Sequence, residues 1–138
     1  MMEQLVFVDR DAAKRLFGTA SADDLTQFVR DLIADSNVPS LSLPERWPVW
    51  EEEFHNDEVE PKTLQWTLSG GQEIVVSDNG SRIQLKRPDV VRQIAGAVQQ
   101  SGGRIVDDPD FAAALQEFYS DAAEKQVAVI FASWPKEN

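Results

Sequence analysis

The most informative feature of the chain is an apolar run near its C-terminal end. Residues 127–132, "VAVIFA", are all apolar. A strand with one face in water alternates apolar and polar residues, whereas a strand covered on both faces is apolar throughout. The run therefore predicts an interior strand of a sheet that carries packed layers on both faces.

Helical patterns along the chain supply those layers. Ser21 is a good N-cap, and the apolar residues after it recur at helical spacing: Leu25, Phe28, Val29, Leu32 and Ile33. A shorter helix is expected before it, capped by Asp9 or Asp11 and ended by Gly18 in a left-handed conformation.

Prolines mark the starts of later helices. Pro88 is expected to open one helix, and Asp108 with Pro109 is expected to cap and open the last. Three prolines within residues 37–48, "NVPSLSLPERWP", predict a connection instead.

The remaining strands are expected at the start and in the middle of the chain. Residues 4–8, "QLVFV", form a short apolar first strand, and residues 63–69, "TLQWTLS", alternate as a half-buried strand does. The pair Asn79-Gly80 between two β-like segments is a strong hairpin signal. The sequence thus predicts one α+β domain over residues 1–138, with a mainly antiparallel sheet, a central hairpin or meander and the order β-α-α-(α)-β-β-β-α-α-β.

Composition narrows the classes of ligand. The chain has 138 residues, no cysteine, and 24 acidic against 13 basic residues, so its net charge is −11. Disulfides and thiolate sites are excluded, and nucleic-acid binding is disfavoured because it needs lysine and arginine against phosphates. No stretch approaches the ~20 apolar residues of a membrane span, and the N-terminal apolar run is too short for a signal peptide. We expect a cytoplasmic protein that holds no cofactor, with its oligomeric state open.

The stretch "RWPVWEEEFHNDEVE", residues 46–60, mixes aromatic and acidic side chains. Pro48 is expected to open a helix that runs to about His55, with Trp47, Trp50 and Phe54 on one face. An apolar stripe at helical spacing is typical of core packing, whereas the crowded carboxylates repel one another unless they are solvated or meet a cation. The sequence therefore predicts a binding surface for a basic protein, formed by Trp47, Trp50, Glu51, Glu52, Glu53, Asp57 and Glu58. Such a module would serve as an inhibitor or antidote of its partner.

An alternative hypothesis is a small hydrolase or metal-dependent enzyme centred on His55 and Glu51. These residues lie one helical turn apart, but a catalytic zinc takes three protein ligands and this chain has a single histidine. His55 at a helix end is explained by the helix dipole alone. The glycine pair in "SGGQ", residues 69–72, is interpreted as a turn. No catalytic or metal-ligating residue is assigned.

Four passages carry a resemblance to a known family. They are "DLTQFVRDLI" after the first strand, "LPERWPVWEEEF", "TLSGGQEI" followed by "PDVVRQIAGAV", and the closing "FAAALQEFYSDAAEKQVAVIFASW". In these passages and in its order of elements, the chain resembles the YfbM-like family of uncharacterised bacterial proteins. The resemblance spans most of the chain and implies an α+β fold, without an activity to carry over.

Overall fold

A computed structural model describes residues 2–18, 21–54, 66–76, 81–101 and 108–134. The strands there are β1 (Met2–Val8), β2 (Ser40–Ser42), β3 (Gln72–Val76), β4 (Arg82–Lys86) and β5 (Ala128–Trp134). The helices there are α1 (Arg10–Phe17), α2 (Ala22–Ala34), α3 (Trp47–Phe54), α4 (Pro88–Ser101) and α5 (Pro109–Lys125).

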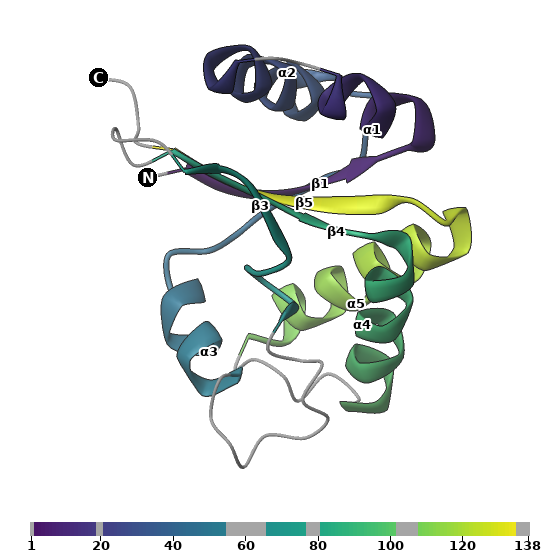
Figure 1. Ribbon diagram of the computed structural model, residues 1–138. Coiled ribbons are helices and arrows are strands. Elements are labelled where there is room, and N and C mark those ends of the chain that lie inside the picture. Colours follow the sequence, from purple (N-terminus) through teal and green to yellow (C-terminus); the bar gives the residue numbers. More distant parts are fainter. Residues whose placement is uncertain (1, 19–20, 55–65, 77–80, 102–107, 135–138) are drawn as a thin grey trace.

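The strands form one sheet with the order β2-β1-β5-β4-β3. All of these neighbours pair antiparallel. The last strand, β5, lies between the first strand and β4, and it pairs with β1 from Met2↔Trp134 to Val8↔Ala128. The two ends of the described chain are therefore joined at the centre of the sheet (Figure 1).

Strand β5 is buried along its whole length. Val129 and Phe131 pack into the core on one face of the sheet, while Ile130 and Ala132 pack into the core on the other. The prediction of an interior strand covered on both faces is confirmed.

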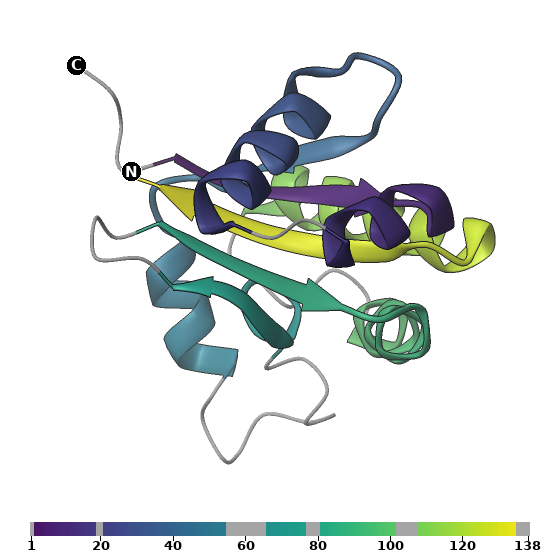
Figure 2. The ribbon, with the colours of Figure 1, turned by 45° about the horizontal axis from the view of Figure 1, so that its top comes forward.

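Two helical layers cover the sheet. Figures 1 and 2 show α1 and α2 over one face and α3, α4 and α5 over the other. The core beneath α1 and α2 includes Leu16 and Val29, and the opposite core includes Trp50, Ile94 and Leu115. The predicted α+β fold, with a mainly antiparallel sheet and helices packed on it, is confirmed.

The predicted helix starts agree with the structure. Asp9, Ser21 and Asp108 each accept a hydrogen bond from a backbone N–H in the first turn of the helix they cap. The left-handed conformation expected at Gly18 is wrong, since its φ is −84° and it ends α1 in a right-handed conformation.

Two local predictions differ from the structure. Strand β2 lies within the stretch predicted as a connection, and pairs with β1 at the sheet edge. Residues 66–69 of the predicted strand are not extended, and Thr67 and Leu68 are both fully buried, which an alternating strand does not allow. The hairpin of β3 and β4 is present, with an irregularity between Glu73 and Val75, and its Asn79-Gly80 turn lies outside the described residues.

Among the described residues, no helix combines the length and the apolar character that crossing a membrane requires.

Candidate functional site

Helix α3 has a core side and an outer side. Trp50 and Phe54 are buried, and the Trp50 ring stacks on Phe111 with 5.2 Å between centroids. Trp47 is partly buried and lies 5.5 Å from the Phe131 ring. The expectation that these aromatic side chains face the core is confirmed, and Trp50 leaves almost no exposed area for a partner to contact.

The outer side of α3 is formed by four exposed residues. They are Pro48, Val49, Glu52 and Glu53. Val49, Glu52 and Glu53 stand at i, i+3 and i+4, so they share one face of the helix. The Val49 side chain is an apolar group left in water, with 48% of its surface exposed. This outer face of α3 presents two carboxylates beside one branched apolar side chain.

Glu51 differs from its two neighbours because it turns toward the protein. It is half-buried, and its Oε1 accepts hydrogen bonds from the backbone N–H of Ser69, at 3.1 Å, and from the Ser69 hydroxyl. Bonds between a carboxylate and N–H or O–H donors are stronger than those between neutral groups. The carboxylate of Glu51 thus ties α3 to the segment that precedes β3.

That segment, Thr67–Gly71, is held by side chains from three elements, and we call it the clamped segment. The Tyr119 hydroxyl of α5 donates to the Thr67 carbonyl. The Lys86 Nζ of β4 donates to the Leu68 carbonyl at 2.8 Å, and the Gln84 Oε1 accepts from the Gly70 N–H at 2.8 Å. These contacts satisfy backbone groups that have no strand partner.

Burial changes the acid–base properties of two of these side chains. Lys86 is 1% exposed, and its removal from water lowers its pKa to about 7, while the nearby Glu51 carboxylate opposes that shift. Burial likewise raises the pKa of Tyr119 above its ordinary value. Lys86 is therefore mainly neutral between about pH 7 and 10.5, where a free lysine would be charged, and Tyr119 stays neutral above the pKa of a free tyrosine.

Trp66 precedes the clamped segment and is 37% exposed. Its ring lies against Gly70, since a Cβ built on that glycine would come within 2.9 Å of the indole Cδ1. Trp66 is therefore an aromatic side chain held in place and left partly in water.

The predicted site residues separate into three groups. Glu52 and Glu53 are exposed on α3, whereas Trp47, Trp50 and Glu51 turn toward the core or the clamped segment. Asp57 and Glu58 lie outside the described residues, as does His55. Within the described ranges, no three side chains of the histidine, cysteine, aspartate and glutamate types gather to hold a metal ion.

Sequence reasoning missed the side chains that hold the clamped segment. Gln84 and Lys86 alternate with Ile83 and Leu85, a pattern that normally places polar groups in water. The sequence alone did not reveal this, because the cover on both faces of β4 follows from its pairing with β5 in the structure. Polar residues pointing into a covered face must find hydrogen-bond partners there.

The fold and the site define an α+β protein with one antiparallel sheet between two helical layers. Its fold is YfbM-like. The crystal structure of YfbM from Escherichia coli, a protein of unknown function, matches with a TM-score of 0.66 over 96% of this chain and 99% of that chain, at 10% sequence identity. The predicted resemblance is thus confirmed at the level of the fold.

Comparison of the sequence with known families and proteins identifies no relative. No protein-family model matches the chain, and no curated protein matches it.

Proposed function

We propose that this protein is a non-enzymatic interaction module that binds a basic protein through the outer face of α3, as an inhibitor or antidote of that partner. The supporting observation is the exposed Val49 beside Glu52 and Glu53 on one helical face. An exposed apolar side chain rimmed by carboxylates fits a partner that presents lysine or arginine around an apolar contact.

The anchoring of α3 supports the same proposal. Trp50 fixes the helix in the core, and Glu51 fixes it to Ser69 of the clamped segment. A surface that is rigid before binding loses less conformational entropy when the complex forms. The outer face of α3 is therefore presented in one orientation.

The charge of the whole chain supports a basic partner. With a net charge of −11, the protein attracts cationic surfaces over a distance set by the salt concentration. Asp57 and Glu58, also predicted for this surface, follow α3 in the sequence and lie outside the described residues. Exposed charges of this kind act mainly on the rate of encounter and on the choice of partner.

No contact among the described residues favours the alternative enzyme centred on His55 and Glu51. Glu51 is engaged by Ser69, and His55 lies outside the described residues.

The experiment is a capture from a lysate of the source cells on immobilised protein, at low and at high salt. The test variant is Glu52→Gln/Glu53→Gln. The matched control is Glu117→Gln/Asp121→Asn, which removes the same charge from an exposed pair on α5. Both variants therefore have the same net charge and differ only in which helix loses its two carboxylates.

We expect one basic protein to be retained by the wild type and the α5 control at low salt, and to be lost with the α3 variant and at high salt. A partner retained equally by both variants would place the interaction elsewhere. Retention of no basic protein by the wild type would contradict the proposal.

A further inference from the structure

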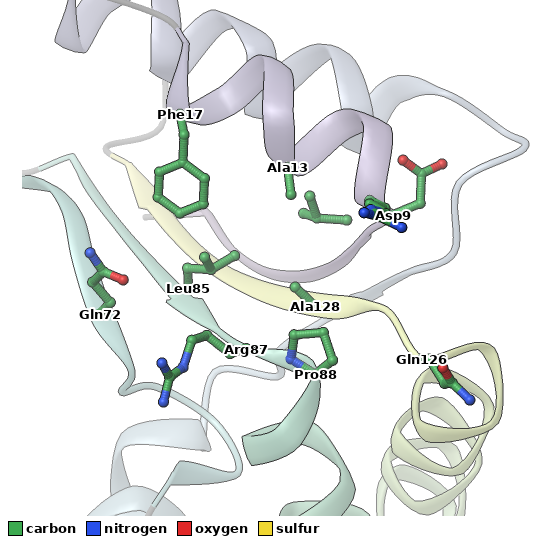
Figure 3. A pocket seen from close by; sticks show the side chains of 11 residues that line it. Asp9, Ala13, Phe17, Gln72, Leu85, Arg87, Pro88, Gln126 and Ala128 are labelled. Atoms are coloured by element: carbon green, nitrogen blue, oxygen red, sulfur yellow. The ribbon is translucent and has the colours of Figure 1, made fainter.

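A groove lies on the opposite face of the sheet from α3, between α1 and the ends of the central strands. Its volume is about 290 Å³. Figure 3 shows the Phe17 ring reaching from α1 toward Leu85, with Ala13 beside it and Ala128 on the strand below. The groove is independent of the outer face of α3, because the two sit in different helical layers (Figure 1).

The floor and wall of the groove are apolar. Val8, Leu85 and Ala128, from three adjacent strands, are each at most 5% exposed and form the floor. Phe17 forms part of the wall and keeps 56% of its surface in water, the largest value among the large apolar side chains described. An apolar occupant would remove this ring from water, which is favourable in proportion to the area covered.

The mouth of the groove carries two arginines in a strongly acidic protein. Arg10 comes from the first residue of α1 and Arg87 from the residue before α4, and both are exposed. Acidic side chains lie near them in sequence: Asp9, which also lines the groove, and Asp11 flank Arg10, and Asp89 follows Arg87. Asp9 accepts a hydrogen bond from the Ala12 N–H at 2.8 Å, and Asp89 lies 3.6 Å from an Arg87 nitrogen in an exposed pair. An exposed pair of this kind is weak and exchanges readily with another anion.

We infer that this groove binds a small organic acid with an apolar body and one carboxylate. The apolar floor takes the body, and a guanidinium at the mouth takes the carboxylate in paired N–H···O bonds. A cationic ligand would be repelled by the two arginines. A polyanion would place some of its charged groups against the apolar wall, where they would find no cation or hydrogen-bond donor. A wholly neutral apolar ligand would cover the floor and leave the arginines unused.

The size of the groove sets the size of the acid. A water molecule takes about 30 Å³ in the liquid, so the groove has the room of about ten waters. A straight-chain acid of about ten non-hydrogen atoms, such as octanoate, fits that space. Ligands of this size bind in the millimolar range or somewhat below it, unless every atom is used well.

The test is a titration of the full chain with octanoate, followed by backbone amide chemical shifts at neutral pH. Octylamine is titrated in parallel, because it has the same tail with a cationic head. The test variant is Arg10→Met/Arg87→Met. The matched control is Lys14→Met/Arg92→Met, which removes one exposed cation from each of α1 and α4 without touching the groove.

We expect octanoate to give saturable shifts centred on Phe17, Leu85 and Ala128, and octylamine to give none. The groove variant should bind octanoate about ten-fold more weakly or worse, and the control should match the wild type. The inference is overturned if octylamine binds as well as octanoate, if the groove variant is unaffected, or if octanoate fails to saturate this site at about 10 mM. The comparison of octanoate with octylamine uses the wild-type protein alone, so it remains valid even if a variant folds poorly.

Discussion

Lys86 shows how burial in this fold shifts a lysine toward its neutral form. Its Nζ donates to the Leu68 carbonyl at 2.8 Å, and its burial lowers its pKa from 10.5 to about 7. The folded state therefore releases a proton that the unfolded chain keeps between these two values. Stability rises with pH in that window, because the unfolded state binds more protons there.

Lys86→Met removes this titration and keeps a side chain of similar length. We expect the unfolding free energy of the wild type to rise with pH relative to the variant, by about 0.7 kcal/mol per pH unit at pH 7 and by about 1.4 kcal/mol per unit near pH 9. Chemical denaturation of both proteins at several pH values measures the difference. Tyr119 is present in both, so its own titration cancels.

A constant difference between the two proteins would contradict the assignment. The Leu68 carbonyl loses a donor in the variant, which costs about 1–3 kcal/mol at every pH and only shifts the curve. If the unfolding free energy of the Lys86→Met variant rose with pH as steeply as that of the wild type, the pH dependence would belong to another group.

At the scale of single residues, the sequence predicted apolar burial better than polar burial. Trp50 and Phe54 follow a helical stripe and lie in the core as expected. Gln84 and Lys86 occupy positions that alternation assigns to water, and only long-range contacts with the clamped segment explain their burial. Such contacts join residues more than ten positions apart, which a local pattern does not encode.

Among the elements, helices were easier to predict than the short extended pieces. Caps and prolines located the starts of α1, α2, α4 and α5, because those signals act within one turn. Strand β2 has three residues and exists through its pairing with β1. The clamped segment likewise takes its shape from side chains of α3, β4 and α5. Neither carries a local signal strong enough to find it.

Gly71 and Gly96 differ in whether the structure requires a glycine. Gly71 has φ +103°, and a Cβ there would lie 2.4 Å from the Leu85 carbonyl oxygen. Gly96 lies exposed within α4, with nothing within 4 Å of an added Cβ. The first position has backbone strain and a clash with backbone, and the second has neither.

We expect Gly71→Ala to destabilise the protein by about 3 kcal/mol or more, since both the conformation and the neighbouring strand oppose the methyl group. Gly96→Ala should stabilise it by about 1 kcal/mol through helix propensity. Midpoints of chemical denaturation check both. Equal effects of the two substitutions would show that the clamped segment moves aside freely.

For the whole molecule, the apolar run at the end of the chain predicted the architecture but not the neighbours of its strand. A strand covered on both faces implies two layers, and both are present around β5. One partner, β1, begins the described chain, and the other, β4, is separated from β5 by α4 and α5. Pairing at that separation depends on how the layers pack, which composition and periodicity leave open.

The two layers also give the molecule two separate candidate sites. The outer face of α3 lies on one side of the sheet, and the groove beneath Phe17 lies on the other. The acidic field of the chain favours a basic protein at the first. Two arginines at the mouth of the second favour a small acid there. Variants at one site should leave binding at the other unchanged.

The most direct test of the account is a titration of the captured basic partner against the wild type and Glu52→Gln/Glu53→Gln over a range of salt. We predict weaker binding by the variant at low salt, a steeper loss with salt for the wild type, and convergence once the screening length falls well below about 10 Å. Superimposable curves for the two proteins at every salt concentration would contradict the assignment of the partner surface to α3.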